Sequence, residues 1–157
     1  MDNLRNTDVP VGTKALILSK LYYGVLSKQL ESLDIERYFS VLYFIHQNPR
    51  CTQQEICNHL AVDKTAMVKV MNYLLKADYI SREINPEDRR EHFVVLSKKG
   101  KRMSTKIVKA FQNIDKKMFA GVSKTEQKIF LNVMMKAMSN LAQLPANDLF
   151  FTYNKTK

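Results

Sequence analysis

The chain has 157 residues, of which 45% are hydrophobic, so it is long and apolar enough for one domain with a buried core. Lys and Arg number 25 against 15 Asp and Glu, and this net charge of +10 favours a polyanionic partner, nucleic acid before an acidic membrane. Two cysteines cannot form a disulfide framework, and neither a signal-peptide pattern nor a long apolar run is visible. We therefore expect a cytoplasmic protein without a spanning helix.

The first two predicted elements are helices. Residues 1–13 are a lead-in, and from Lys14 to Leu33 apolar residues recur at helical spacing over about five turns. A second helix is expected from Ile35 to Gln47. It ends before Asn48-Pro49, because a proline moves the preceding residue out of the α region.

Two short helices are predicted next. Thr52-Gln53-Gln54-Glu55 reads as a capping box, which opens a helix through Leu60. Asp63 is a good N-cap for the following helix, whose apolar residues share one face. Because only about three residues join the two helices, the pair has the local form of a helix-turn-helix.

The second half of the chain predicts a hairpin and two long helices. β-prone stretches at 79–84 and 91–96 flank a charged turn that contains a proline. Ser97 can cap a long helix, and the capping box at 123–126 starts the last one, which stops before Pro145. A helix-turn-helix followed by a two-stranded wing predicts a mostly α fold with a small β wing, the winged-helix architecture of DNA-binding proteins.

The helix after Asp63 is the candidate recognition helix. Opposite its apolar face runs a stripe of four side chains that can donate to base edges and phosphates. Its first turn would meet the bases, and Val68 could contact a thymine methyl group. The alternative is an amphipathic helix with a solvated polar face. The candidate residues are Lys64, Thr65, Ala66, Val68, Lys69, Asn72 and Lys76.

The predicted tip of the wing carries Asp88-Arg89-Arg90. A hairpin beside a recognition helix can place an arginine in the minor groove, where narrow A·T tracts strengthen the negative potential. Asp88 can hold the guanidinium of Arg90 by a charge-assisted hydrogen bond. The alternative is a solvated charged turn.

Together, residues 34–100 resemble the multiple-antibiotic-resistance regulator (MarR) family of winged-helix transcription factors. The Pro-x-Asp-Arg-Arg run, at its distance behind the helix-turn-helix, is the most specific element, whereas the flanking helices match by length and placement only. The runs that carry the resemblance are 52–56, 62–69, 74–82, 85–90 and 96–100.

The resemblance implies a homodimeric, sequence-specific regulator, expected to be a repressor, on a pseudo-palindromic operator. It places Thr65, Ala66 and Lys69 in the major groove and the wing tip, with Asp88 and Arg90, in the minor groove. Two residues would lie where the preceding helix meets the DNA backbone, namely Thr52 and Gln53.

Three positions depart from the family pattern. Lys69 stands where the family often has Arg, and a lysine is a point charge without the bidentate fork. Val68 replaces a hydroxyl residue. Asp78 replaces a common glycine after the recognition helix, which we expect to be tolerated because Asp adopts left-handed geometry better than most residues.

The long helices at 14–33, 101–119 and 124–144 carry more apolar surface than one protomer's core can cover, and exposed patches of that size mark interfaces. The alternative is a plain helical core. The resemblance assigns 14–33 and 101–157 to a dimerisation lobe and 35–100 to a DNA-binding lobe of one domain, 1–157. The apolar tail 149–153 would pack across the partner.

The resemblance also implies a small aromatic or phenolic effector, bound in a cleft between the lobes. Tyr22, Tyr23, Tyr38 and Tyr43 could line it, although tyrosines at helical spacing are more often core residues. We expect the two cysteines to be buried structural thiols and not peroxide sensors. With no catalytic constellation and no ligand-spaced histidines, we expect no enzyme activity, metal or cofactor.

The net positive charge lies entirely in the C-terminal part of the chain, after residue 96. Residues 1–60 and 61–96 each hold 6 basic and 6 acidic residues, whereas 97–157 hold 13 and 3. Cations at a helix N-terminus oppose the helix dipole. The lysines that follow the wing are therefore better explained by a nearby polyanion than by a merely solvated helix face. The hypothesis is that Lys98, Lys99 and Lys101 bind phosphate. The alternative function is non-specific, architectural DNA binding, which a specificity ratio would distinguish.

Overall fold

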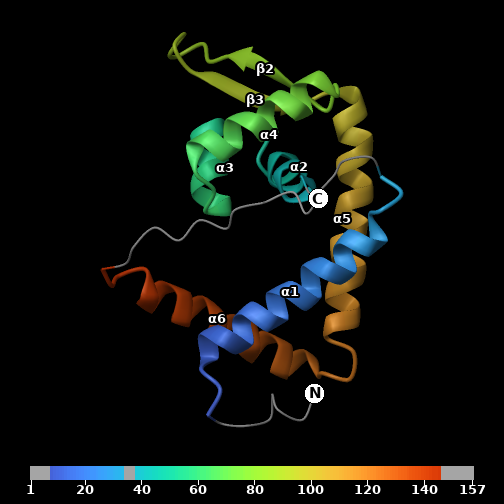
Figure 1. Ribbon diagram of the computed structural model, residues 1–157, viewed down its shortest axis with the longest axis vertical. Helices are drawn as coiled ribbons and strands as arrows, with labels where there is room; N and C mark the ends of the chain where they lie inside the picture. The colour runs from blue at the N-terminus through green and yellow to red at the C-terminus, as the bar shows by residue number, and fades with distance from the viewer. Residues whose placement is uncertain (1–7, 34–37, 146–157) are drawn as a thin grey trace.

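The computed structural model describes residues 8–33 and 38–145. A compact head contains the sheet and three short helices, and α5 runs from this head to a second group formed by α1 and α6 (Figure 1). In chain order the elements are α1 (Val11–Gln29), α2 (Phe39–Gln47), β1 (Cys51–Thr52), α3 (Gln53–Leu60), α4 (Lys64–Lys76), β2 (Ile80–Ile84), β3 (His92–Leu96), α5 (Lys98–Met118) and α6 (Lys124–Leu141). The mostly helical fold with a small β wing is confirmed.

The predicted helix starts are set by side-chain caps. Thr52 and Ser123 both form complete capping boxes with the glutamate three residues later. Asp63 accepts a hydrogen bond from the amide of Ala66, and Ser97 caps α5 in the same way. Each cap supplies an acceptor for an amide that the helix itself leaves without one.

Helix ends differ from the sequence expectation by a few residues. Helix α1 begins at Val11, directly after Pro10, whose carbonyl accepts from the amide of Lys14. The expected start of the second helix at Ile35 lies outside the described residues, as does the apolar tail. Among the described residues, no helix combines the length and the apolarity needed to span a bilayer.

The sheet has three antiparallel strands in the order β1-β3-β2. The wing strands pair in the register Ile80–Leu96 to Ile84–His92. Strand β1, which the sequence analysis did not predict because it has only two residues, pairs Thr52 with Phe93. Because Thr52 also caps α3, β1 fastens the helix-turn-helix directly to the wing.

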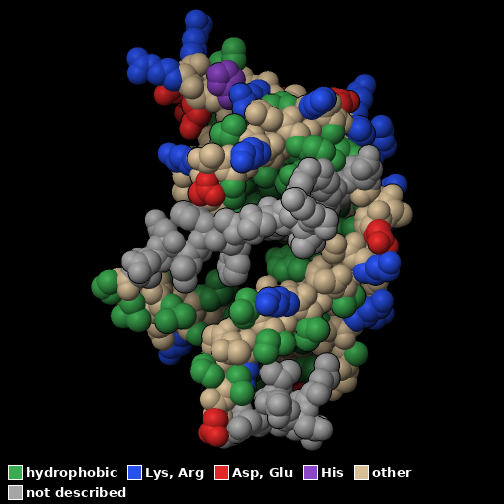
Figure 2. Space-filling view, in the orientation of Figure 1, with side chains coloured by type: hydrophobic (Ala, Val, Ile, Leu, Met, Phe, Trp, Pro, Cys, Tyr) green, Lys and Arg blue, Asp and Glu red, His purple; other side chains and the backbone are tan. Residues whose placement is uncertain are grey.

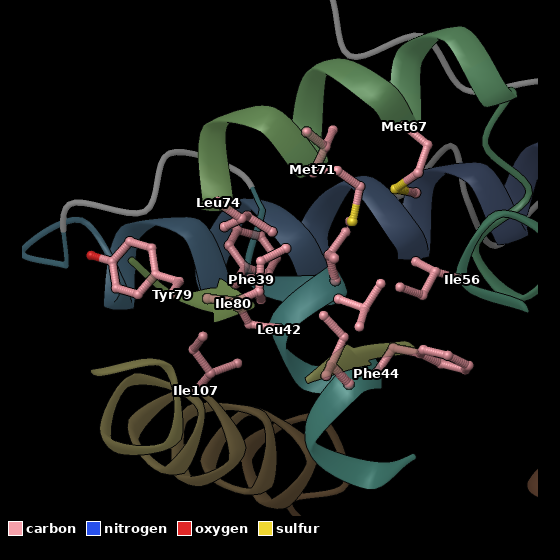
Figure 3. Close-up of a cluster of buried hydrophobic side chains, with 14 of the residues drawn as sticks. Phe39, Leu42, Phe44, Ile56, Met67, Met71, Leu74, Tyr79, Ile80 and Ile107 are labelled. Atoms are coloured by element: carbon pink, nitrogen blue, oxygen red, sulfur yellow. The ribbon is translucent and has the colours of Figure 1, made fainter. Parts of the chain in front are cut away.

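One hydrophobic cluster holds the head together. Figure 3 shows Met67, Met71 and Leu74 entering the cluster from α4, with Leu42 from α2 and Ile107 from α5. All five side chains are essentially inaccessible to solvent. Full burial of such a side chain stabilises the fold by about 1.5–3 kcal/mol, so this cluster fixes α4 on the head.

Two helix ends place a residue other than glycine in the left-handed region. Ala61 closes α3 with φ 49° and ψ 48°, in the turn of the helix-turn-helix. Asp78 follows α4 with φ 58°. The left-handed geometry expected at Asp78 is therefore confirmed. A Cβ in this region costs roughly 1–2 kcal/mol, which glycine avoids.

This strain predicts that Ala61→Gly stabilises the protein. Removing the Cβ should raise the free energy of unfolding by about 0.5–1 kcal/mol after the greater chain entropy of glycine is subtracted. The measurement is urea denaturation at a fixed protein concentration.

Ala77→Gly is the matched control, because Ala77 caps α4 with a φ of −82° that alanine adopts without strain. It should lower the free energy of unfolding by about 0.5–1 kcal/mol. Equal destabilisation by both substitutions would contradict the assignment of strain to Ala61.

Candidate nucleic-acid interface

Helix α4 is divided into a buried face and a solvent face as the sequence predicted. Met67, Val70, Met71 and Leu74 are buried. Val68 is 46% exposed at the border of the polar stripe, and Ala66 is half-buried. The exposed candidates are Lys64, Thr65, Lys69, Asn72 and Lys76.

The two candidate residues at the start of α3 are half-buried. The Thr52 hydroxyl accepts from the amide of Glu55 at 3.2 Å and donates to its carboxylate at 3.0 Å. The Thr52 side chain is thus committed to the capping box, and Gln53 occupies the first position of the helix. The capping box therefore fixes the start of α3.

The wing ends in a loop held by its own side chains. Asn85, only 8% exposed, donates its side-chain amide to the carboxylate of Glu91 at 2.9 Å and accepts from the amide of Glu87 at 3.0 Å. The backbone amide of Glu91 in turn donates to the carbonyl of Asp88. The sequence places Asn85 in the charged turn, since Asn-Pro after a strand is a turn signal, but it does not predict these hydrogen bonds.

Asp88 has a different partner from the one expected. Its carboxylate accepts from the backbone amide of Arg90 at 2.9 Å. It makes no ion pair with the guanidinium, since neither of the two ion pairs among the described residues involves Arg90. Aspartate favours this bond because its short side chain reaches the amide two residues ahead. The tip is therefore ordered while both arginine side chains remain exposed, and cationic side chains project from the wing in Figure 2.

The basic start of α5 contains cations in two different situations. Lys98, Lys101 and Arg102 are exposed. Lys99 is also exposed, but its Nζ donates to the carbonyl of Ala77 at 2.7 Å and lies 4.3 Å from the ring centre of Tyr79. These four cations are thus not equivalent, because Lys99 is bound to the end of α4.

The four candidate effector tyrosines do not form one group. Tyr22 and Tyr23, in contact with each other, line a cavity of about 980 Å³ between α1, α5 and α6. Tyr43 packs on Phe111, with ring centres 4.6 Å apart. Tyr38 lies against Tyr73 of α4, with ring centres 4.9 Å apart. The structure therefore brings only two of the four to this cavity.

Tyr22 is held in the cavity wall by a hydrogen bond. Its hydroxyl donates to the carboxylate of Asp115 at 2.7 Å. Burial raises the pKa of Tyr22 strongly, and the hydrogen bond and charge of Asp115 raise this pKa further. The phenol consequently stays protonated and acts as a donor within the cavity.

Both cysteines lie inside the head, as expected. Cys51 and Cys57 are 4% and 5% exposed. Burial raises the pKa of the Cys51 thiol to about 11 and also raises that of Cys57. Across residues 8–33 and 38–145, no cluster of three or more His, Cys, Asp or Glu side chains could hold a metal ion.

Comparison with known proteins agrees with this geometry. A model of the MarR family matches residues 35–91. An uncharacterized HTH-type transcriptional regulator of Bacillus subtilis (strain 168), YwhA, is 24% identical over 115 residues, which cover 70% of this chain and 83% of the relative.

Two solved structures share the fold. A MarR family transcriptional regulator from Listeria monocytogenes, crystallised with a 26-mer DNA, superposes with a TM-score of 0.80 at 16% identity, over 85% of this chain and 90% of that one. The reduced form of MarR from E. coli gives a TM-score of 0.71 at 23% identity, over 84% and 98%.

The exposed face of α4 beside an ordered cationic wing is the winged-helix arrangement that these structures share, and the matching curated relative is a transcriptional regulator. Residues 35–91 match the model of the MarR family of such regulators, so the resemblance seen in the sequence is confirmed. The relatives are regulators of transcription and not enzymes.

The buried thiols predict low reactivity and a pH-dependent stability. At pH 8 a thiol reagent should modify both cysteines slowly in the folded protein and rapidly in urea. Folding favours the protonated thiol of Cys51, so its contribution to stability is complete below its ordinary pKa of 9.0 and is lost as pH rises toward about 11.

Urea denaturation at pH 8 and pH 10.5 measures this loss, and Cys51→Ala should reduce the difference between the two pH values. Rapid modification of the folded protein at pH 8 would contradict the prediction.

Proposed function

We propose that the protein is a homodimeric, sequence-specific repressor that binds a pseudo-palindromic operator, in the cytoplasm of its cell. The observation that carries the proposal is the pairing of an uncovered polar face on α4 with a wing tip ordered by the hydrogen bonds of its own Asn85 and Asp88 side chains. A base-reading surface needs both features, because side chains on a rigid support reach defined positions in the grooves.

In this proposal α4 enters the major groove and the wing enters the minor groove. Lys69 and Asn72 can pair with purine edges, and Arg90 can insert where an A·T tract narrows the minor groove. The start of α3 and the start of α5 would contact the flanking phosphates. The proposed DNA-binding residues are Thr52, Gln53, Lys64, Thr65, Ala66, Val68, Lys69, Asn72, Lys76, Asp88, Arg89, Arg90, Lys98 and Lys101.

The exposed apolar surface of α1 and α6 supports the homodimer. No side chain of α6 is buried. Val133, Met135 and Leu141 are each more than 60% exposed, and Leu21 and Val25 on α1 are about half exposed. Surfaces of this kind mark protein–protein contacts. Residues 14–33 and 101–157 would then form the dimerisation lobe, and 35–100 the DNA-binding lobe, of one domain spanning 1–157.

A small-molecule effector would fit the cavity lined by Tyr22 and Tyr23. The cavity lies between α1, α5 and α6, and its wall combines aromatic rings with the Tyr22–Asp115 hydrogen bond. An aromatic or phenolic compound could stack on the rings and reach this polar pair. Binding there would change how α5 packs, which would relieve repression.

The test of the proposed function is selection of genomic fragments by the purified full-length chain. A regulator should enrich a small set of fragments with inverted half-sites about one helical turn apart. It should keep a preference of at least about a thousandfold over random duplex at physiological salt. Enrichment without a shared motif would indicate an architectural DNA-binding protein.

Within this proposal, Arg90→Ala should weaken binding to a selected duplex by about 1–3 kcal/mol, with the largest loss where the flank is A·T-rich. Fluorescence anisotropy with a labelled duplex measures the loss. The control is Lys128→Ala, which removes an exposed cation from α6. Equal effects of the two substitutions would show that Arg90 contributes charge only.

The dimer predicts that Met134→Glu dissociates the protein, since an unpaired carboxylate in an apolar interface carries a desolvation cost of several kcal/mol. Sedimentation velocity at about micromolar concentration, a range in which specific interfaces hold, measures the change. Asn132→Glu is the matched control, because it puts the same charge on an exposed polar position of the same helix. An unchanged sedimentation coefficient for Met134→Glu would exclude this interface.

A further inference from the structure

The chain that leaves α4 is fastened to the first turn of α5. Three consecutive carbonyls follow the helix, and each accepts a hydrogen bond from that turn. Ala77 accepts from Lys99 Nζ at 2.7 Å, and Asp78 accepts from the Ser97 hydroxyl at 2.6 Å. Tyr79 accepts from the backbone amide of Ser97 at 3.1 Å. The start of one helix therefore caps the end of the other.

The two segments are also in steric contact. A Cβ built on Gly100 would lie 1.9 Å from the carbonyl oxygen of Tyr79, so the α5 backbone approaches closer than any other residue would allow. Tyr79 is buried, and its ring supports the ammonium of Lys99 at 4.3 Å. Lys99 is thus held by a carbonyl and by an aromatic face.

The helix dipoles explain why a cation occupies this position. A lysine in the first turn of α5 opposes the dipole of its own helix, but the same ammonium lies at the C-terminal end of α4, where positive charge is favourable. Among the described residues, Lys98 makes no comparable contact although it carries the same charge one position earlier. The two lysines therefore have different roles.

We propose that Lys99 is a positioning residue that locks the recognition helix to α5, and that it is not a phosphate contact. Since α5 runs from the head to α1 and α6 (Figure 1), this lock makes the placement of α4 follow the placement of α5. The proposal rests on the proposed function in one respect only, namely that α4 reads bases.

The experiment compares Lys99→Met with Lys98→Met in the full-length protein. Both remove one charge and keep an unbranched apolar chain. Binding is measured on a duplex taken from the genomic selection and on a scrambled duplex, each over a series of salt concentrations. Hydrogen exchange of the amides at 77–79 is measured on the free protein.

Lys99→Met should reduce the preference for the selected duplex about fivefold, the equivalent of losing one contact of about 1 kcal/mol. It should leave the slope of log K against log salt unchanged and accelerate exchange at 77–79. Lys98→Met should make this negative slope less steep by about 0.9, as expected for the loss of one phosphate contact. Its preference and exchange should match the unsubstituted protein. Lys99→Arg keeps a charged donor that stacks on tyrosine and should restore the preference.

The proposal would be overturned if Lys99→Met makes the salt slope less steep by about 0.9 while the preference for the selected duplex and the hydrogen exchange at 77–79 stay unchanged. If the unsubstituted protein shows no preference for any duplex, the proposed function fails, and the exchange measurement alone decides whether Lys99 locks the two helices. Thermal denaturation of each variant checks that the exchange change is confined to this joint.

Discussion

The architecture depends on one constraint, which is that α4 must be fixed on one side and bare on the other. Met67, Met71 and Leu74 are buried in a cluster that also contains residues of α2, α3 and α5, and the opposite side of α4 is left in solvent. The short strand β1 and the cap at Thr52 then fasten α3 to the wing. A helix held in this way loses little conformational entropy when a duplex docks on it, so more of the contact energy appears as affinity.

In the proposed function, the charge distribution separates the residues that attract DNA phosphates from the residues that contact the bases. The segment 61–96, with the recognition helix and the wing, has no net charge, and the excess lies after residue 96. Electrostatic attraction to phosphates acts on every sequence alike, whereas bonds to base edges differ between sequences. In the proposed function, the segment that reads bases therefore adds no net charge of its own, and the excess positive charge that attracts phosphates lies after it. The internal bonds of the wing tip serve the same end, because Asp88 uses its charge on the backbone and leaves the arginines available.

Local signals explain how much of this could be predicted from the sequence. Each helix cap acts within three residues, so the sequence predicts the caps at Thr52, Asp63, Ser97 and Ser123. The buried and exposed faces of α4 follow from its helical period and are predicted for the same reason. Contacts between distant residues were not predictable. Lys99 and Ala77 are 22 positions apart, and nothing in the sequence distinguishes Lys99 from Lys98. In the sequence, Tyr38 and Tyr43 look like Tyr22 and Tyr23, since all four lie in helical patterns. Tertiary packing nevertheless leaves Tyr38 and Tyr43 out of the cavity wall. The sequence predicts the wrong partner for Asp88, because the backbone amide and the guanidinium of Arg90 are two donors that compete for the same carboxylate.

The bare surface of α6 has a consequence for how the protein responds to its own abundance. An isolated helix of 18 residues is marginal in water even with a capping box, and here no side chain is buried by the protomer's own core. Pairing with a second copy would supply the missing burial, so order in this helix would follow mass action. Occupancy of a two-part operator would then rise with more than the first power of protein concentration. A cell could silence such a regulator by dilution during growth, without any ligand.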